Sequence, residues 1–303
     1  MNSSAIVIGL GELLWDLLPS GPQLGGAPAN FAYCSHLLGN RGIVVSRLGD
    51  DVPGREAREQ LRECGIADEY IQADSAYSTG TASVELDDAG QPRFEIKPAA
   101  AWDFLEWNSA LEQLACSCNA VCFGTLAQRS ERSRETILKF LESTQKDTLR
   151  VFDVNLRQSF YSAELLKKSL ARANAVKLND QELPVIARLL GIGEGAFCST
   201  VLEMFELRFI CVTRGEKGSV LFGRDGARDH PGFRVTLKDT VGAGDAFTAG
   251  LVHEHLRGAS ISEMNETANR IGAWVASCAG AMPRAPDEGL ATVLAEINRS
   301  LNR

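Results

Sequence analysis

A glycine-rich turn followed by a carboxylate is the strongest chemical signal in the chain. Residues 239–247 read Asp-Thr-Val-Gly-Ala-Gly-Asp-Ala-Phe, and an apolar helical stretch follows them. Glycines let the backbone approach a ligand closely, and N–H groups at a helix start attract an anion. The helix dipole should favour the charged form of Asp245, so we expect a weak base that is ionised at neutral pH. Phosphoryl transfer needs little more, although spacing alone leaves an ordinary capped helix as the alternative.

A second polar cluster lies near the start of the chain. Gly25 and Gly26 are followed by Asn30, and Asp16 precedes them. Backbone N–H groups, a carboxamide and a carboxylate together supply the donors and acceptors that hydroxyl groups need. The cluster suits a polyol or a sugar, with a plain loop as the alternative.

A third cluster stands where a strand-like segment gives way to a helix-like one. Asn179 and Glu182 are three residues apart there. Magnesium in proteins keeps several of its waters, so Glu182 could contact a metal-bound water while Asn179 contacts a phosphate. A simple helix cap is the alternative.

Several common sites are excluded by their missing motifs. The chain has no G-x-x-x-x-G-K-[ST] loop and no G-x-S-x-G elbow, and Gly9-Leu10-Gly11 does not continue as a dinucleotide fingerprint. His253 and His255 are two residues apart and do not share a helix face, so we expect them to be packed or solvated. The eight cysteines include no C-x-x-C pair, and we expect buried thiols, as in a reducing cytosol.

The charge balance limits the partners. The chain has 31 basic and 39 acidic residues, a net charge of -8, which argues against nucleic acid and against an anionic membrane surface. The N-terminus has no signal-peptide pattern, and no apolar run approaches the roughly 20 residues of a membrane span. We expect a cytoplasmic protein that acts on small molecules and binds any polyphosphate locally.

Strand-like and helix-like segments alternate along most of the chain, which predicts a mostly parallel sheet covered on both faces. Ligands of such sheets bind at the carboxyl ends of the strands, where the second and third clusters fall. Strands are predicted at 5–10, 43–49, 120–123, 150–153, 175–178, 209–212 and 219–222, and helices at 31–38, 53–64, 130–145, 161–172, 180–190, 196–206, 244–257, 262–278 and 287–301.

Residues 79–97 break this alternation. Polar and apolar side chains alternate there on either side of the turn residues 87–92, which predicts an antiparallel hairpin with one apolar face. We interpret it as an inserted lid, with a plain edge hairpin as the alternative.

The three clusters, in this order, resemble the PfkB (ribokinase-like) family of carbohydrate kinases over nearly the whole chain. Residues 25–30, Gly-Gly-Ala-Pro-Ala-Asn, resemble its N-terminal signature. Residues 239–247 resemble its long C-terminal signature, and residues 179–182 match its N-x-x-E motif. The resemblance implies one ribokinase-like, doubly wound α/β domain over residues 1–303, with a small β-sheet lid from segments near 12–22 and 79–97.

The resemblance also implies roles for individual residues. Asp245 would deprotonate a sugar hydroxyl, and the amides of Gly242, Ala243 and Gly244 would hold the transferring phosphate. The remaining roles divide by ligand: Asp16, Gly25, Gly26, Asn30 and Arg157 for the sugar; Asn179, Thr213, Gly215, Gly218 and Asn269 for ATP; Glu182 for Mg²⁺ through water. Some family members bind K⁺ through carbonyls near the positions of Asp239 and Val241 and through the loop that is here 279–283, so K⁺ is left open.

Three segments resemble the fructokinase branch and so favour fructose as the substrate: residues 11–19, 98–103 and the Asp-x-Asn-x-Arg of 153–157. Val154 departs from this pattern, because fructokinases often carry proline there. A 2-keto-3-deoxygluconate kinase, a ribose kinase, a nucleoside kinase and a catalytically silent sensor are the alternatives. A homodimer through the lid is a further expectation.

Overall fold

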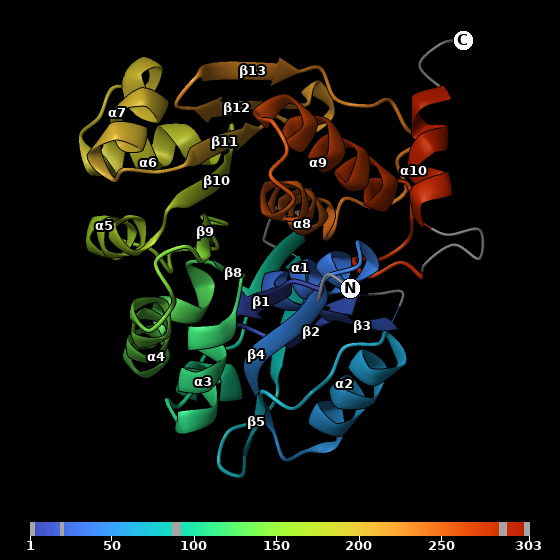
Figure 1. The fold of residues 1–303 in the computed structure, drawn as a ribbon. Helices are drawn as coiled ribbons and strands as arrows, with labels where there is room; N and C mark the ends of the chain where they lie inside the picture. Colours follow the sequence, from blue (N-terminus) through green and yellow to red (C-terminus); the bar gives the residue numbers. More distant parts are fainter. Residues whose placement is uncertain (1–3, 19–20, 87–91, 285–289, 300–303) are drawn as a thin grey trace.

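The computed structural model of the protein describes residues 4–18, 21–86, 92–284 and 290–299. Its strands form two separate sheets of nine and four strands, and helices lie on both sides of the larger one (Figure 1). The predicted α/β class with a mostly parallel sheet is confirmed.

The nine-stranded sheet runs in the order β13-β12-β11-β10-β9-β8-β1-β4-β5. The seven strands from β5 to β11 in this order are parallel, and β12 and β13 add antiparallel at one edge. The strands are β1 (Ile6–Leu10), β4 (Arg41–Gly49), β5 (Ile71–Asp74), β8 (Ala120–Phe123), β9 (Leu149–Asp153), β10 (Ala175–Asn179), β11 (Phe209–Thr213), β12 (Ser219–Gly223) and β13 (Gly226–His230).

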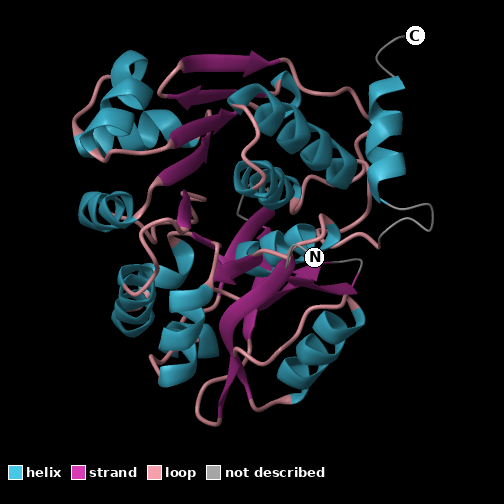
Figure 2. Cartoon of the chain, in the orientation of Figure 1, coloured by secondary structure: helices cyan, strands magenta, loops and turns pink. Residues whose placement is uncertain are grey.

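The helices form two layers, one on each face of the nine-stranded sheet (Figure 2). One layer holds α3 (Ser109–Ser117), α4 (Glu131–Glu142), α5 (Ala163–Arg172), α6 (Glu182–Leu190) and α7 (Phe197–Met204). The other holds α1 (Ala27–Leu37), α2 (Val52–Glu63), α8 (Ala243–Leu256), α9 (Ile261–Ala276) and α10 (Leu290–Arg299). Strand residues alternate between two cores, as when Ile8 joins the α3–α7 side and Val7 the α1–α8 side.

The small sheet runs in the order β3-β2-β6-β7 and begins directly after β1. Its strands are β2 (Leu14–Leu18), β3 (Gly21–Gly25), β6 (Gly80–Leu86) and β7 (Pro92–Ile96). The predicted hairpin is confirmed, since β6 and β7 pair antiparallel from Ala82 opposite Ile96 to Leu86 opposite Pro92. Its turn residues 87–91 lie outside the described residues. Ala82 and Ile96 are buried with Trp102, so an apolar face of this sheet is covered by the same chain.

Three elements were not predicted: β5, α3 and β13. β5 has four residues, and β13 is an edge strand whose sequence Gly-Ala-Arg-Asp-His is almost wholly exposed and has no apolar alternation. The first predicted helix starts four residues earlier, at Ala27, because Pro28 fits the first turn of a helix. Among the described residues, no single helix has the length and apolar character to cross a membrane. Only the bent pair 182–190 and 194–204 meets both criteria jointly.

Candidate active site

The glycine-rich turn forms the start of α8. Gly242 is the N-cap residue with φ of 76°, and a Cβ there would lie 2.7 Å from the Cβ of Ala281. Both facts require glycine at this position. The first N–H groups of a helix have no carbonyl partner inside it, so the turn presents donors to an anion. The N–H of Ala243 donates to the Thr240 carbonyl at 3.3 Å, which tightens the turn.

The two ends of the sequence meet at Asp245. The Nδ2 of Asn30, on α1, donates to the Oδ2 of Asp245 at 2.8 Å across 215 positions of sequence. The Oδ1 of Asn30 is buried without a hydrogen-bond partner among the described residues. The expected sugar-binding asparagine and the expected base therefore face each other, with one carboxamide oxygen left to accept a hydroxyl.

The electrostatics of Asp245 differ from the expectation. Burial raises the pKa of this carboxyl to about 6, and the nearby Asp153 carboxylate adds to the rise. The hydrogen bond from Asn30 and the charges of Lys177 and Arg157 act in the opposite direction. The net shift therefore disfavours the charged form relative to a solvated aspartate, contrary to the prediction, because desolvation is its largest cause. Asp245 is still mostly ionised at pH 7, but it is a better base than a solvated aspartate.

Asp16 lies directly over Gly25. A Cβ at Gly25 would collide with the Asp16 Oδ2, and a Cβ at Gly26 would lie 2.5 Å from the Glu12 carbonyl oxygen. The double glycine is thus needed for close packing of β3 against the segment after β1. Burial raises the pKa of Asp16 to about 6, against the charge of Arg157.

Glu12 is a buried carboxyl that was not among the expected site residues. It is 3% exposed, and its Oε2 has no hydrogen-bond partner among the described residues. Burial raises its pKa to about 7, while Arg157 lowers it and Asp245 raises it. Its neighbourhood with Asp16 was visible in sequence, but its burial depends on packing that spacing does not reveal.

The N-x-x-E motif forms a reciprocal cap at the start of α6. The Oδ1 of Asn179 accepts the N–H of Glu182 at 2.8 Å, and the Oε2 of Glu182 accepts the N–H of Asn179 at 2.8 Å. The Oε1 of Glu182 accepts the N–H of Leu156 at 2.8 Å, so the motif also fixes the loop that carries Arg157. Arg157 is exposed, and its positive charge lowers the pKa of Glu12, Asp16 and Asp245 alike.

Sequence patterns did not predict a buried ion pair next to the glycine-rich turn of α8. The Nζ of Lys177 lies 3.1 Å from the Oδ1 of Asp153, and both side chains are less than a tenth exposed. The Thr248 hydroxyl lies 2.9 Å from the Oδ2 of Asp153 and 3.0 Å from the Gly244 carbonyl oxygen. The sequence signal was a lysine inside the otherwise apolar strand 175–178.

Four of the five expected ATP residues lie at or next to the β11–β12 connection, and the fifth, Asn179, ends β10 opposite Thr213. Gly218 has φ of 76°, and a Cβ there would collide with the carbonyl of His230. The Nδ2 of Asn269, on α9, donates to the Oγ of Ser219 at 2.8 Å, which places Asn269 next to Gly218. Thr213 ends β11, and its carbonyl accepts the N–H of Asp180 at 2.9 Å. Gly215, with φ of 58°, starts the short 3₁₀ turn between the strands.

The two segments expected for K⁺ lie in contact. The N–H of Gly280 donates to the Oδ2 of Asp239 at 3.1 Å, and the N–H of Val241 donates to its Oδ1 at 3.0 Å. Loop 279–283 is further fixed by the Tyr33 hydroxyl, which donates to the Pro283 carbonyl at 2.7 Å. Among the described residues, no group of three His, Cys, Asp or Glu side chains has the arrangement of a metal site.

Two other expectations concern groups outside the site. His253 and His255 are partly buried and contact Asn40 and Arg208 respectively, so the packed alternative holds. Five of the eight free cysteines are buried and two are half-buried, but Cys116 is exposed.

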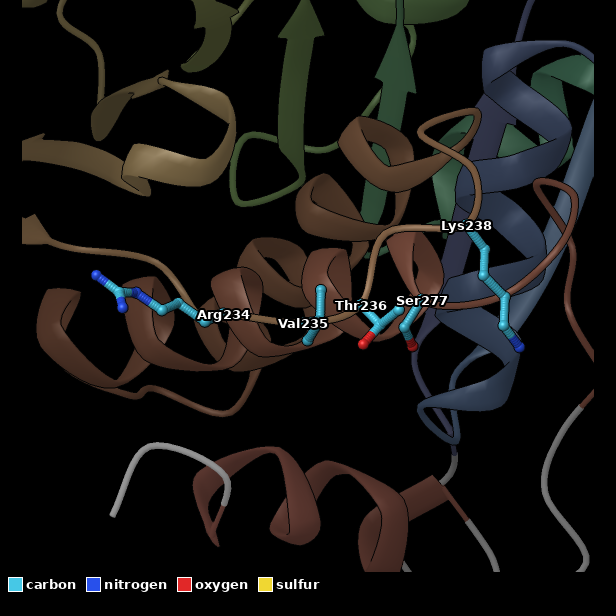
Figure 3. Close-up of a pocket in the computed structure, with 5 residues that line it drawn as sticks. All are labelled: Arg234, Val235, Thr236, Lys238 and Ser277. Atoms are coloured by element: carbon cyan, nitrogen blue, oxygen red, sulfur yellow. The ribbon is translucent and has the colours of Figure 1, made fainter. Parts of the chain in front are cut away.

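A cavity of about 530 Å³ lies along the extended segment before the turn. Figure 3 shows the side chains of Arg234 and Lys238 extending away from each other, at the two ends of segment 234–238. Its lining residues are Arg234, Val235, Thr236, Lys238 and Ser277. The cavity shares no lining residue with the cluster around Asp245.

Comparison with known proteins decides the family. Residues 22–288 match the model of the pfkB family carbohydrate kinases. The chain belongs to the pfkB family. It is an ATP-dependent sugar kinase. It is 33% identical over 256 residues to a fructokinase of Klebsiella pneumoniae, covering 80% of this chain and 82% of that protein.

Solved structures agree with this assignment. A Vibrio cholerae fructokinase, solved with fructose, ADP and a calcium ion, is 26% identical with a TM-score of 0.79, covering 96% of this chain and 98% of that one. A Xylella fastidiosa fructokinase with bound ATP has a TM-score of 0.85 at 23% identity, covering 98% of this chain and 99% of that one, which supports the fold.

Proposed function

We propose that this sugar kinase is a fructokinase that transfers the γ-phosphate of ATP to a fructose hydroxyl with Asp245 as the base. The Asn30–Asp245 hydrogen bond of 2.8 Å carries the proposal, because it joins the sugar-binding turn to the phosphate-binding turn. The fructokinase names of several relatives at 28–33% identity support fructose as the sugar.

We propose the following roles for the surrounding residues. Asp16, with Gly25, Gly26 and Asn30, receives the sugar hydroxyls, and Arg157 balances the carboxylates. Asp245 removes the proton from the attacking hydroxyl, while the helix start at Gly242, Ala243 and Gly244 binds the transferring phosphate. Asn179, Thr213, Gly215, Gly218 and Asn269 bind ATP. The loose transition state of phosphoryl transfer then requires little beyond this positioning and charge neutralisation.

The cation proposal has two parts. Both oxygens of Glu182 already accept a backbone N–H, so this carboxylate fits contact with Mg²⁺ through a bound water rather than direct ligation. When bound with ATP, Mg²⁺ neutralises phosphate charge. The contact of Gly280 with Asp239 supports K⁺ at the carbonyls of Asp239 and Val241.

We further propose that the small sheet, with segments 12–22 and 79–97, is a lid over the sugar inside a single domain of residues 1–303. Its other face is proposed to join two copies into a homodimer. The eight free thiols fit a cytoplasmic location.

The test is a coupled ADP-release assay with Mg²⁺-ATP and a panel of sugars and nucleosides. We expect turnover with D-fructose to exceed that with ribose, 2-keto-3-deoxygluconate and adenosine by at least about tenfold in kcat/KM. Preference for another acceptor would reject fructose but keep the kinase. Absence of ADP with every acceptor would indicate a sensor. Replacement of K⁺ by Na⁺ in the same assay tests the potassium site.

A further inference from the structure

Lys177 is a buried cation in a strand whose neighbours are apolar. A lysine is rarely fully buried unless it is paired, and Lys177 is paired with Asp153 at 3.1 Å. A buried ion pair adds little net stability compared with an apolar pair of similar volume, because both charges lose their water. Stability alone is therefore a weak explanation for this pair.

The position of the pair points to the phosphate-binding turn. A Cβ built on Gly244 would lie only 3.1 Å from the Nζ of Lys177, so the ammonium lies directly against the first turn of α8. The Thr248 hydroxyl, within hydrogen-bond distance of both Asp153 and the Gly244 carbonyl, ties the pair to the same turn. β9, β10 and α8 are thus joined by one polar contact chain next to the proposed base.

We propose that Lys177 is a positioning residue for phosphoryl transfer, a fixed buried charge held by Asp153 and Thr248 that keeps the α8 turn receptive to an anion and Asp245 ionised. The inference rests on the proposed function, in which Asp245 is the base. A cation in a site of low dielectric acts at full strength without reorganisation when negative charge develops nearby.

The charges that face Asp245 come from several elements. Asp153, Lys177, Arg157 and Glu12 interact electrostatically with it, and Asn30 donates to it from α1. The charge of Asp245 also acts on the thiols of Cys34 and Cys122. Burial is the largest cause of its raised pKa; Asp153 raises it further and Lys177 lowers it.

Lys177 itself stays charged. Burial lowers its pKa, but the carboxylates of Asp153, Glu182 and Asp245 overcome this effect and raise the pKa to about 12. The two members of the pair therefore shift the pKa of Asp245 in opposite directions. A purely structural role would not produce opposite shifts in the pH dependence of the activity when each is replaced.

The experiment compares Lys177→Met, Asp153→Asn and the double variant in the full chain. We expect Lys177→Met to lower kcat about 100-fold, with the sugar KM changed less than about threefold, and to move the acidic limb of the kcat–pH profile about one unit upward. Asp153→Asn should move that limb downward. The double variant, with no buried charge left unpaired, should fold, keep its limb near the wild-type position and remain slow.

Two outcomes would overturn the proposal: acidic limbs that stay in place or move together in the single variants, or a double variant with wild-type kcat. Thermal unfolding of each variant separates these from simple loss of folded protein. If Lys177→Met does not fold, the pH profile of Asp153→Asn and the kcat of the double variant still test the proposal. Failure of the proposed function would appear separately, as a wild-type enzyme without sugar turnover or with no acidic limb.

Discussion

At the scale of the residue, Asp245 combines a raised pKa with a fixed hydrogen bond. Its neighbours act in opposite directions, since Asp153 and burial favour the neutral form while Asn30, Lys177 and Arg157 favour the charged form. The balance leaves a base whose strength suits neutral pH.

The first prediction is the pH dependence of turnover. A base must be deprotonated to act, so kcat/KM for fructose should fall as the pH drops through the pKa of Asp245 in the sugar-free enzyme and reach about half its plateau near pH 6. Initial rates at subsaturating fructose between pH 5 and 8 measure it. A kcat/KM that is constant over this range would contradict the assignment of Asp245 as the base.

The second prediction concerns stability. The pKa of Asp245 is raised on folding from 3.8 to about 6, so folding binds a proton between these two pH values. The ionised carboxyl opposes folding by an amount that grows from pH 3.8 and is complete above pH 6. Asp245→Asn should therefore raise the free energy of unfolding at pH 8 by about 1 kcal/mol, or the melting temperature by a few degrees. The gain should shrink as the pH falls below 6 and disappear below pH 3.8. A variant less stable than wild type at pH 8 would contradict the stated balance.

The third prediction concerns Gly25, whose missing side chain makes room for Asp16. Gly25→Ala should displace the Asp16 carboxylate and raise the fructose KM about tenfold or more, with a smaller effect on the KM for ATP. Gly193→Ala is the matched control, because a Cβ there meets nothing within 4 Å. Equal kinetic effects of the two substitutions would remove Asp16 from the sugar site.

At the scale of the element, the β11–β12 connection depends on its glycines to different degrees. Gly215 and Gly218 both have positive φ, but only at Gly218 would a Cβ meet backbone, namely the carbonyl of His230. Alanine substitutions at the two positions therefore distinguish the cost of backbone strain from the cost of a steric collision.

The fourth prediction follows from this difference. Gly215→Ala should destabilise the protein by about 1 kcal/mol, which is the usual penalty for alanine at positive φ. Gly218→Ala should destabilise it by about 2–3 kcal/mol and raise the KM for ATP about tenfold, because the connection must move. Urea unfolding and ATP titrations of the kinase rate measure both. The reverse order of the two variants would reject the loop geometry.

Sequence patterns predicted the elements whose hydrophobic period and length were both typical of a strand or a helix. They failed for elements that lacked these features. The hairpin of β6 and β7 and the helix at Ala243 carried clear patterns. β5 and β13 did not, since the first is four residues long and the second is an exposed edge strand. Lys177 was missed because a lone lysine in a strand usually indicates a solvated position, and only the fold places Asp153 3.1 Å away.

At the scale of the whole molecule, two distant signatures form one site because α1 and α8 pack on the same face of the sheet. Asn30 and Asp245 were both predicted, but their contact, and the burial that sets the pKa of Asp245, depend on the assembled fold. Long-range desolvation cannot be read from local spacing, which is why the sign of that shift was wrong.

The most direct test of the account is the kcat of Asp245→Asn with D-fructose and Mg²⁺-ATP, measured by ADP release beside Asp225→Asn, a control on the exposed turn before β13. The account predicts that Asp245→Asn lowers kcat by about 10²–10⁴-fold while fructose binding changes less than about threefold, and that the control is unaffected. A kcat for Asp245→Asn within about threefold of wild type would contradict it.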